Sequence, residues 1–270
     1  MKYLPDAAQL DALLAAVFCA GKAILEIRDR GAKYTNKQDG SPVTEADQLA
    51  ETILLNAIHT QFPAIAVIAE EQAEAGKTPE TGDTFFLVDP LDGTKEFIRG
   101  GTDFTVNIGL IHQEKPVFGI VYAPVDGRLF VGSDDGTAWQ AIVDCRDENP
   151  QITKRQNLQV RPADGQSLVA VASRSHRDQA TNNWLTKRQI EQVVSAGSSL
   201  KFCLLAAGEA DVYPRFGPTM QWDTAAAHAV LNAAGGAVTM ISGAAFTYGK
   251  SEQARPYLNP GFIAWGGWRG

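Results

Sequence analysis

The sequence predicts a mixed α/β protein in which two lobes form a layered sandwich. In the first half, two amphipathic helical patterns precede a run of strand patterns, whereas strands and helices alternate in the second half. A polar, weakly patterned stretch from about 145 to 165 separates the two halves. We therefore expect an N-terminal α+β lobe over 1–145 and a C-terminal α/β lobe over 146–270.

Length and composition narrow the class of protein. A chain of 270 residues with 44% hydrophobic and 20% charged residues is long and apolar enough to bury a substantial core. The formal net charge of −7 disfavours binding to a nucleic acid polymer, which needs an extended basic surface. A small anionic substrate stays open, because a bound metal ion can supply local positive charge.

The cysteines and the apolar runs indicate a cytoplasmic protein. Cys19, Cys145 and Cys203 are odd in number and form no C-x-x-C pair. Cys19 and Cys203 lie in apolar helical patterns, where buried free thiols are expected. The apolar run 13–20 is too short to span a bilayer, so no transmembrane segment is expected. Peripheral attachment to the cytoplasmic side of the inner membrane and assembly as a homodimer both stay open.

The first half begins with two helices that have recognisable starts. Asp6 can cap a helix whose apolar residues recur at helical spacing up to Leu25. A second helix is expected to begin after Thr44, because Asp47 stands three residues further on in a capping-box arrangement. A short apolar strand over 64–69 then leads to Glu70, and an acidic loop over 72–83 follows.

Strands dominate the rest of the first half. The apolar run 85–88 predicts a short buried strand, which Pro90 is expected to stop because proline cannot donate to a sheet. Further strands are expected over 104–110, 116–122, 128–131 and 137–140, the last two joined as a hairpin.

In the second half the same criteria predict alternating elements. Strands are expected over 168–172, 211–213, 237–240 and 262–265, and helices over 178–187, 200–207 and 223–234. Gly235 and Gly236 are expected to end the last of these helices.

The segment Asp89-Pro90-Leu91-Asp92-Gly93-Thr94 is the central chemical motif. Two carboxylates three residues apart repel one another unless a cation lies between them. Oxygen ligands of this kind suit a hard divalent ion such as Mg²⁺. The alternative is that Asp92-Gly93 forms only a turn.

Three more acids stand where an expected element begins or ends. Asp47 lies in the first turn of a helix, Glu70 follows a strand, and Asp223 stands where a helix begins. Each has a purely structural alternative, because Asp47 and Asp223 can serve as helix caps and Glu70 can be a solvated charge.

Taken together, these motifs resemble those of a known family. Glu70-Glu71, the segment from Asp89 to Thr94, and Trp222-Asp223-Thr224-Ala225-Ala226 resemble, in order and approximate spacing, the inositol monophosphatase superfamily. The resemblance implies a layered αβαβα sandwich of the inositol monophosphatase and fructose-1,6-bisphosphatase type. It also implies a Mg²⁺-dependent, lithium-sensitive phosphomonoesterase.

The resemblance further implies a role for each acid. Glu70, Asp89 and the carbonyl of Leu91 would hold one Mg²⁺, and Asp89 would bridge to a second ion, completed by Asp92 and Asp223; two or three ions are expected in all. Asp47 and Thr94 would orient and deprotonate the attacking water. Such an arrangement is chemically coherent, because paired metal ions can stabilise the attacking and leaving oxygens of an in-line displacement.

Three polar clusters in the second half would select the substrate. They are Ser173–Arg177, Gly197–Phe202 and Tyr213–Phe216, and they resemble the 3'(2'),5'-bisphosphate nucleotidase branch of the superfamily. The resemblance implies that His176, Ser198, Lys201 and Arg215 contact the nucleotide, with Asp223 also beside the substrate. Small polar residues near Lys or Arg would suit an extra phosphate. The structural alternatives are that His176 is a loop residue, Ser198 a helix cap and Arg215 a surface side chain.

The expected reaction is therefore hydrolysis of the 3'-phosphate of adenosine 3',5'-bisphosphate to AMP and phosphate, in sulfur assimilation and in recycling of that nucleotide. A first alternative is an inositol or other sugar phosphate monophosphatase, against which the basic Lys201 and Arg215 argue. A second alternative, from a different class, is a non-catalytic protein that binds nucleotide phosphates. That alternative would be favoured by loss of a metal-binding acid, and all of them are present.

Overall fold

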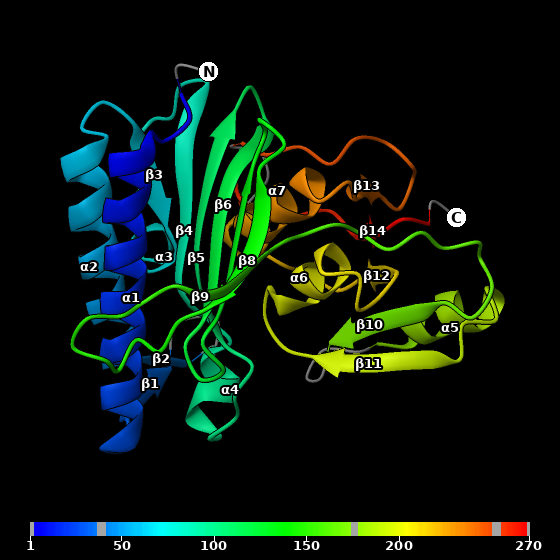
Figure 1. Cartoon of the computed structure of the whole chain (residues 1–270), viewed down its shortest axis with the longest axis horizontal. Helices are drawn as coiled ribbons and strands as arrows, with labels where there is room; N and C mark the ends of the chain where they lie inside the picture. Colours follow the sequence, from blue (N-terminus) through cyan, green and yellow to red (C-terminus); the bar gives the residue numbers. More distant parts are fainter. Residues whose placement is uncertain (1–2, 37–41, 174–177, 250–254, 269–270) are drawn as a thin grey trace.

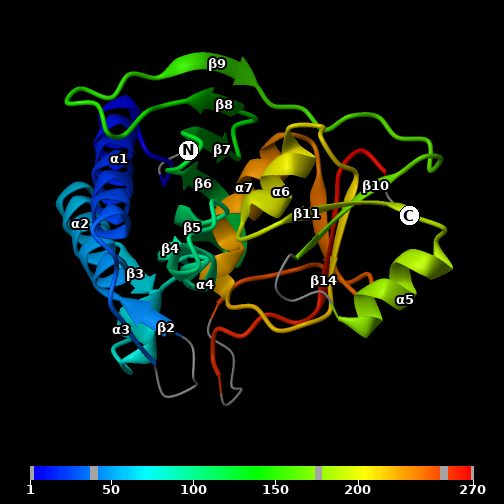
Figure 2. The ribbon, with the colours of Figure 1, turned by 90° about the horizontal axis from the view of Figure 1, so that it is seen from below.

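The computed structural model describes residues 3–36, 42–173, 178–249 and 255–268 in five layers (Figures 1 and 2). Helices α1 (Ala7–Asp29) and α2 (Glu45–Gln61) form the outer layer against a seven-stranded sheet. Helices α6 (Leu200–Ala206) and α7 (Ala225–Ala233) lie between that sheet and a five-stranded one. Helix α5 (Gln179–Lys187) packs on the far side of the smaller sheet. The expected αβαβα layering is confirmed.

Both N-terminal helices begin where their capping residues predict. The Asp6 carboxylate accepts a hydrogen bond from the Gln9 backbone N–H at 2.9 Å, and Thr44 with Asp47 forms the capping box of α2. Leu13, on the apolar face of α1, is fully buried among the side chains between this helix layer and the sheet. Local capping and apolar spacing thus place the layer that covers one face of the main sheet.

The main sheet has the strand order β3-β4-β5-β6-β7-β8-β9, with β3 parallel to β4 and the remaining pairs antiparallel. Its strands are β3 (Ala66–Ala69), β4 (Thr84–Asp92), β5 (Thr105–His112), β6 (Lys115–Ala123), β7 (Arg128–Ser133), β8 (Ala138–Ile142) and β9 (Thr153–Asn157). Strand β9 extends this sheet past residue 145; the division into lobes at 145/146 stays a prediction.

The expectation that Pro90 ends its strand is wrong. Strand β4 continues through Pro90 to Asp92. The pairing of β4 with β5 shifts register between Asp89 and Asp92, so the ladder is already irregular at the proline. This irregular end of β4 places Asp89, Leu91 and Asp92 at one corner of the sheet.

The smaller sheet has the order β11-β10-β12-β14-β13. Strand β10 (Val169–Ser173) pairs in parallel with β11 (Gln192–Ala196) and β12 (Val212–Arg215). Strand β14 (Phe262–Trp265) is antiparallel to both β12 and β13 (Ala237–Met240). The ends of β10 and β12 bring Ser173 and Arg215 to the cavity described below.

Helix α7 lies close against the main sheet because three glycines leave room for it. Gly109, Gly119 and Gly132 are cross-strand neighbours on β5, β6 and β7. A Cβ on Gly119 would overlap the backbone of Ala226, and one on Gly132 would overlap Val230. We call these three residues the glycine seat. It fixes the start of α7, and with it the preceding 3₁₀ turn η1 (Gln221–Asp223).

The remaining elements are short and were not expected from the sequence. They are β1 (Tyr34–Asn36), β2 (Pro42–Thr44), α3 (Glu70–Glu74) and α4 (Thr94–Ile98).

All three cysteines carry free thiols, but the expected burial of Cys19 is wrong because its side chain lies on the exposed side of α1.

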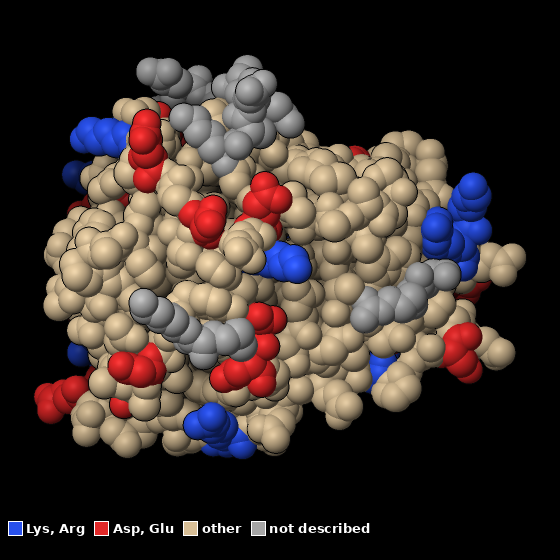
Figure 3. Space-filling view, turned by 90° about the horizontal axis from the view of Figure 1, so that it is seen from above, with Lys and Arg blue, Asp and Glu red and all other residues tan. Residues whose placement is uncertain are grey.

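Two properties concern the surface of the molecule as a whole. No helix in the described part of the chain is long and apolar enough to cross a membrane. On the face seen in Figure 3, the described acidic and basic side chains are interspersed and form no broad basic area.

Candidate active site

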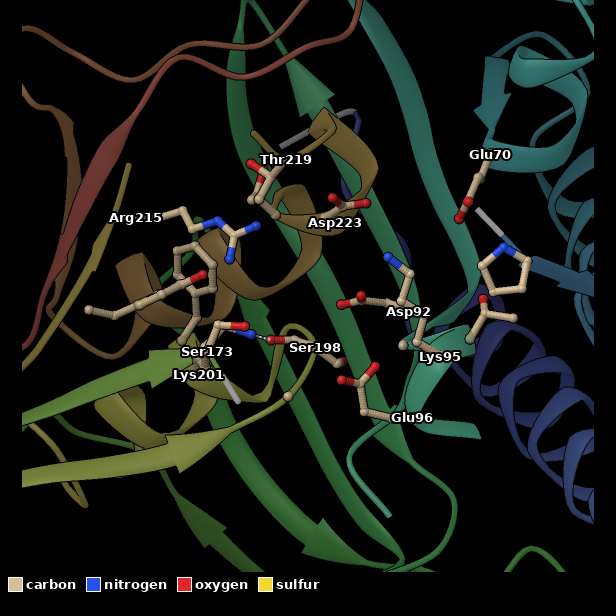
Figure 4. Close-up of a pocket in the computed structure, with 17 residues that line it drawn as sticks. Glu70, Asp92, Lys95, Glu96, Ser173, Ser198, Lys201, Arg215, Thr219 and Asp223 are labelled. Carbon is tan, nitrogen blue, oxygen red and sulfur yellow. Dashed lines mark hydrogen bonds between the residues drawn. The ribbon is translucent and has the colours of Figure 1, made fainter. Parts of the chain in front are cut away.

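A cavity of about 230 Å³ opens where the two sheets meet. Its walls bring together residues from β2, α3, the end of β4, α4, β10, α6, β12 and the approach to α7. Figure 4 shows Arg215 and Lys201 on one side, facing Glu70, Asp92 and Asp223. Seven of the predicted site residues line this cavity: Glu70, Asp92, Thr94, Ser198, Lys201, Arg215 and Asp223.

Asp89 is the buried centre of the acidic side. It is 1% exposed, and the Glu70 carboxyl is near enough to affect its ionisation. Burial, together with the charges of Glu70, Asp92 and Asp223, raises the pKa of Asp89 well above its usual value. Burial likewise raises the pKa of Asp223 to about 7, and the Asp92 charge adds to this effect. The acids therefore oppose one another's ionisation, and a bound cation would favour their charged forms.

The donor set fits a hard divalent cation. Burial and the neighbouring acids favour the protonated form of Asp89, and a cation can take the place of that proton. The Leu91 backbone supplies a carbonyl at the same corner, where its N–H donates to the Asp89 carboxylate at 3.0 Å. Among the described residues, no group of three or more His, Cys, Asp or Glu side chains could hold a metal ion as it stands. A bound ion would thus need the Leu91 carbonyl, water or a closer approach of the acids.

Asp47 and Thr94 form a hydrogen-bonded pair beside these acids. The Thr94 hydroxyl donates to Asp47 Oδ1 at 2.9 Å, and Asp47 Oδ2 accepts from the backbone N–H and the hydroxyl of Thr44, each at 2.7 Å. Asp47 is 1% exposed and is therefore held rigidly at the start of α2. The predicted cap role and the predicted site role of Asp47 coexist in one side chain.

The opposite side of the cavity is basic. Lys201 is 6% exposed, and its ammonium group donates to the Ser198 carbonyl and lies 5.4 Å from the centre of the Tyr213 ring. Burial lowers the pKa of Lys201 to about 8, an effect that the nearby Asp92 charge opposes. Arg215 donates to the carbonyls of Gly217 and Pro218, at 3.2 and 2.9 Å. Both cations are thus oriented by backbone carbonyls.

The predicted site residues and the residues that line the cavity do not coincide fully. His176 lies outside the described residues, so its contact with the substrate stays a prediction. Sequence reasoning missed Glu96 and Thr219 as cavity residues, along with Lys95. Glu96 follows Asp92 by four residues, and a short helix after the motif would have indicated that it lines the same cavity. No sequence signal distinguishes Thr219 from an ordinary loop threonine.

The fold and this site define a family. The chain matches the model of the inositol monophosphatase family over residues 6–260 and belongs to that family. The resemblance expected from the acidic motifs is confirmed.

Several relatives are similar over nearly the whole chain. The 3'(2'),5'-bisphosphate nucleotidase CysQ of Salmonella typhimurium is 45% identical over 246 residues, which cover 90% of this chain and 94% of the relative. The Escherichia coli K12 protein of the same name is 42% identical over the same shares. The crystal structure of CysQ from Bacteroides thetaiotaomicron is 35% identical, with a TM-score of 0.74, and the match covers 96% of this chain and 97% of that one.

Proposed function

We propose that this protein is a Mg²⁺-dependent phosphomonoesterase that hydrolyses the 3'-phosphate of adenosine 3',5'-bisphosphate, giving AMP and phosphate. The observation that carries the proposal is that one cavity joins a cluster of carboxyl groups to two buried cations, Lys201 and Arg215. The similarity to curated bisphosphate nucleotidases over 90% of the chain supports the same substrate.

The proposed metal site uses the acidic side of the cavity. Glu70, Asp89 and the Leu91 carbonyl would hold one Mg²⁺, and Asp89, Asp92 and Asp223 a second; two or three ions are expected. When bound, Mg²⁺ would neutralise phosphate charge and make the attacking water more acidic. Burial and the charges of the neighbouring acids raise the pKa of Asp89, which supports this assignment because a cation would offset both effects.

Asp47 and Thr94 would prepare the attacking water. When the Thr94 hydroxyl gives its hydrogen to Asp47, the shorter of its two hydrogen bonds, its oxygen is free to accept one from another donor. A water in the cavity could donate one hydrogen to Thr94 and would then present a lone pair to the phosphorus. Asp47, fixed by Thr44, is the group to which the proton can pass.

Lys201 and Arg215 would bind the part of the substrate that does not react. A bisphosphate carries a second phosphate, and buried cations held by backbone carbonyls form a pre-oriented site for it. Inositol monophosphates lack that group and would leave Lys201 and Arg215 without an anionic partner. Ser198 and Asp223, which also line the cavity, would contact the nucleotide between the two phosphate sites.

Phosphate release from adenosine 3',5'-bisphosphate and from inositol 1-phosphate, measured side by side with Mg²⁺ and then with added Li⁺, tests the proposal. We expect strong preference for the nucleotide and loss of activity on adding Li⁺. Preference for inositol 1-phosphate would keep the metal chemistry but overturn the substrate. Release from neither would favour a non-catalytic binding protein.

A further inference from the structure

The turn Gly197–Ser199 lies between the acidic and basic sides of the cavity and contacts both. The Ser198 hydroxyl contacts that of Thr105, which lies opposite Asp92 in the pairing of β4 with β5. Burial raises the pKa of Asp92, and the polar groups of Ser198 and Ser199 oppose that rise. The Ser198 carbonyl accepts from the Lys201 ammonium group, as Figure 4 shows. One turn therefore sets the position of an acid of the proposed metal site relative to a cation of the proposed substrate site.

The backbone at this turn is strained. Ser198 has a φ of +56°, in the left-handed region that residues with a side chain seldom adopt. Such a conformation persists only where the surroundings impose it, and it often marks a functional position. In the left-handed conformation the hydroxyl of Ser198 reaches that of Thr105 while its carbonyl reaches Lys201.

A buried network on strand β5 imposes that conformation. Thr105 and Asn107 are both 0% exposed. The Thr105 hydroxyl contacts that of Ser198 and lies 2.8 Å from that of Ser199. The Ser199 hydroxyl donates to Asn107 Oδ1 at 2.6 Å, and Asn107 Nδ2 donates to Thr105 Oγ1 at 3.0 Å. We call Thr105, Asn107 and Ser199 the clasp.

The neighbouring contacts leave the turn little freedom. Asp103, two residues before Thr105, accepts a hydrogen bond from the Gly197 backbone N–H at 2.8 Å. A side chain on Gly197 would overlap Asp103, so only glycine allows this approach. Both ends of the turn are thus attached to the segment that leads into β5. That strand pairs with β4, where Thr105 lies opposite Asp92.

We infer that Thr105 and Asn107 are positioning residues for recognition of a second phosphate. They lie outside the cavity lining and act through Ser198 and Ser199, whose turn holds Lys201 at a fixed place relative to Asp92. The consequence is selectivity for a substrate whose two phosphates have one particular separation. The inference rests on the proposed function, because it takes Lys201 to bind the phosphate that does not react.

The proposed role depends on the hydrogen bonds of the clasp and not on the packing of its side chains. Thr105→Val keeps the shape of the side chain and removes the hydroxyl, whereas Thr105→Ser keeps the hydroxyl. Ser199→Ala removes a hydroxyl at the edge of the network and leaves the backbone unchanged, and it serves if Thr105→Val fails to fold. Thr84→Val is the matched control, since the Thr84 hydroxyl bonds His112 at 2.7 Å at the opposite end of β4.

The test compares two substrates that share the scissile 3'-phosphate, adenosine 3',5'-bisphosphate and adenosine 3'-monophosphate. We expect Thr105→Val to lower the ratio of their kcat/KM values about tenfold, mainly through a higher KM for the bisphosphate. Thr105→Ser and Thr84→Val should keep the wild-type ratio. Amide hydrogen exchange at residues 198–201 should become faster in Thr105→Val and Ser199→Ala, and it should stay slow in Thr105→Ser.

Each outcome decides the inference. Equal loss of activity on both substrates, or unchanged exchange at 198–201 in both Thr105→Val and Ser199→Ala, would overturn it. A wild-type protein that does not prefer the bisphosphate would refute the proposed function instead. In that case the exchange measurement still decides whether the clasp holds the turn.

Discussion

Asp92 is the residue at which the two sides of the cavity meet. Burial raises the pKa of Asp92, and the Lys201 charge and the polar groups of Ser198 and Ser199 oppose that rise. The charge of Asp92 in turn adds to burial in raising the pKa values of Asp89 and Asp223. The proposed cation would offset this cost by favouring the charged form of Asp92.

Replacing Asp92 by Asn should therefore abolish turnover while leaving the protein folded. We expect kcat to fall by at least about a hundredfold, because the amide is neutral and a poorer ligand for a hard cation. The thermal midpoint without metal should stay the same or rise, since one repelling charge is removed. Steady-state kinetics and a melting curve on the same sample measure both effects. Asp126→Asn, at an exposed acid between β6 and β7, is the control; near-normal activity of Asp92→Asn would refute the metal assignment.

His228 gives a prediction for acid stability. It is 3% exposed, its Nδ1 lies 3.0 Å from the Tyr248 hydroxyl, and burial lowers its pKa to about 3. Between about pH 6.5 and 3 the unfolded chain binds a proton at this position and the folded protein does not, so stability falls as the pH falls. The contribution is about 1.4 kcal/mol per pH unit in that range.

His228→Gln should consequently flatten the dependence of the unfolding free energy on pH below about 6, as measured by urea denaturation at several pH values. His59→Gln, at an exposed position on α2, should keep the wild-type slope. Equal slopes for wild type and His228→Gln would show that His228 is not held neutral.

At the scale of the elements, the sequence predicts those helix and strand boundaries that residues close by in the chain determine. The starts of α1 and α2 follow from Asp6 and Thr44, because capping is complete within a few residues. Strand β9 was missed because all of its residues are exposed, so no apolar alternation marks it. The predicted end of strand β4 at Pro90 is too early. The proline is accommodated by a register shift in the pairing of β4 with β5, and the sequence of one segment does not reveal that pairing.

The glycine seat predicts the effect of a small substitution. Gly119→Ala should destabilise the protein by about 1–3 kcal/mol, because the added methyl group would overlap the Ala226 carbonyl and push α7 outward. Activity should fall as well, since Asp223 directly precedes α7. Urea denaturation and kcat measure the two effects. Gly82→Ala, where a Cβ would have no neighbour within 4 Å, is the control, and full activity with normal stability of Gly119→Ala would contradict the close packing.

At the scale of the whole molecule, metal binding should stabilise the fold, because the proposed ligands come from separate elements: α3, β4 and the approach to α7. Mg²⁺ at a hundred times its dissociation constant should add about 2.7 kcal/mol to the free energy of unfolding. A chelator should reverse the gain. Thermal melting with Mg²⁺ and with a chelator measures it; Asp92→Asn should lose most of the gain, and a wild type that shows no gain would contradict the proposed site.

The site was predictable to the extent that its residues belong to motifs. Glu70, Asp89, Asp92 and Asp223 stand in short segments that can be recognised by themselves, and three of them line one cavity around buried Asp89. Thr105 and Asn107 were not predictable as part of the site. Their role depends on contact with Ser199, which is 92 residues from Asn107 along the chain. A strand pattern gives the same prediction whether or not that contact exists.

The glycine seat also has a consequence for biosynthesis. Strands β5 to β7 leave the ribosome well before Ala225–Ala233 is made, by roughly 5–20 s at usual rates of synthesis. Until then the sheet face that α7 covers, with apolar side chains such as Val121 and Phe130, has no partner in the chain. The nascent protein therefore passes through a stage in which a chaperone or rapid completion must protect it from aggregation, and the acidic site closes only at the end of that stage.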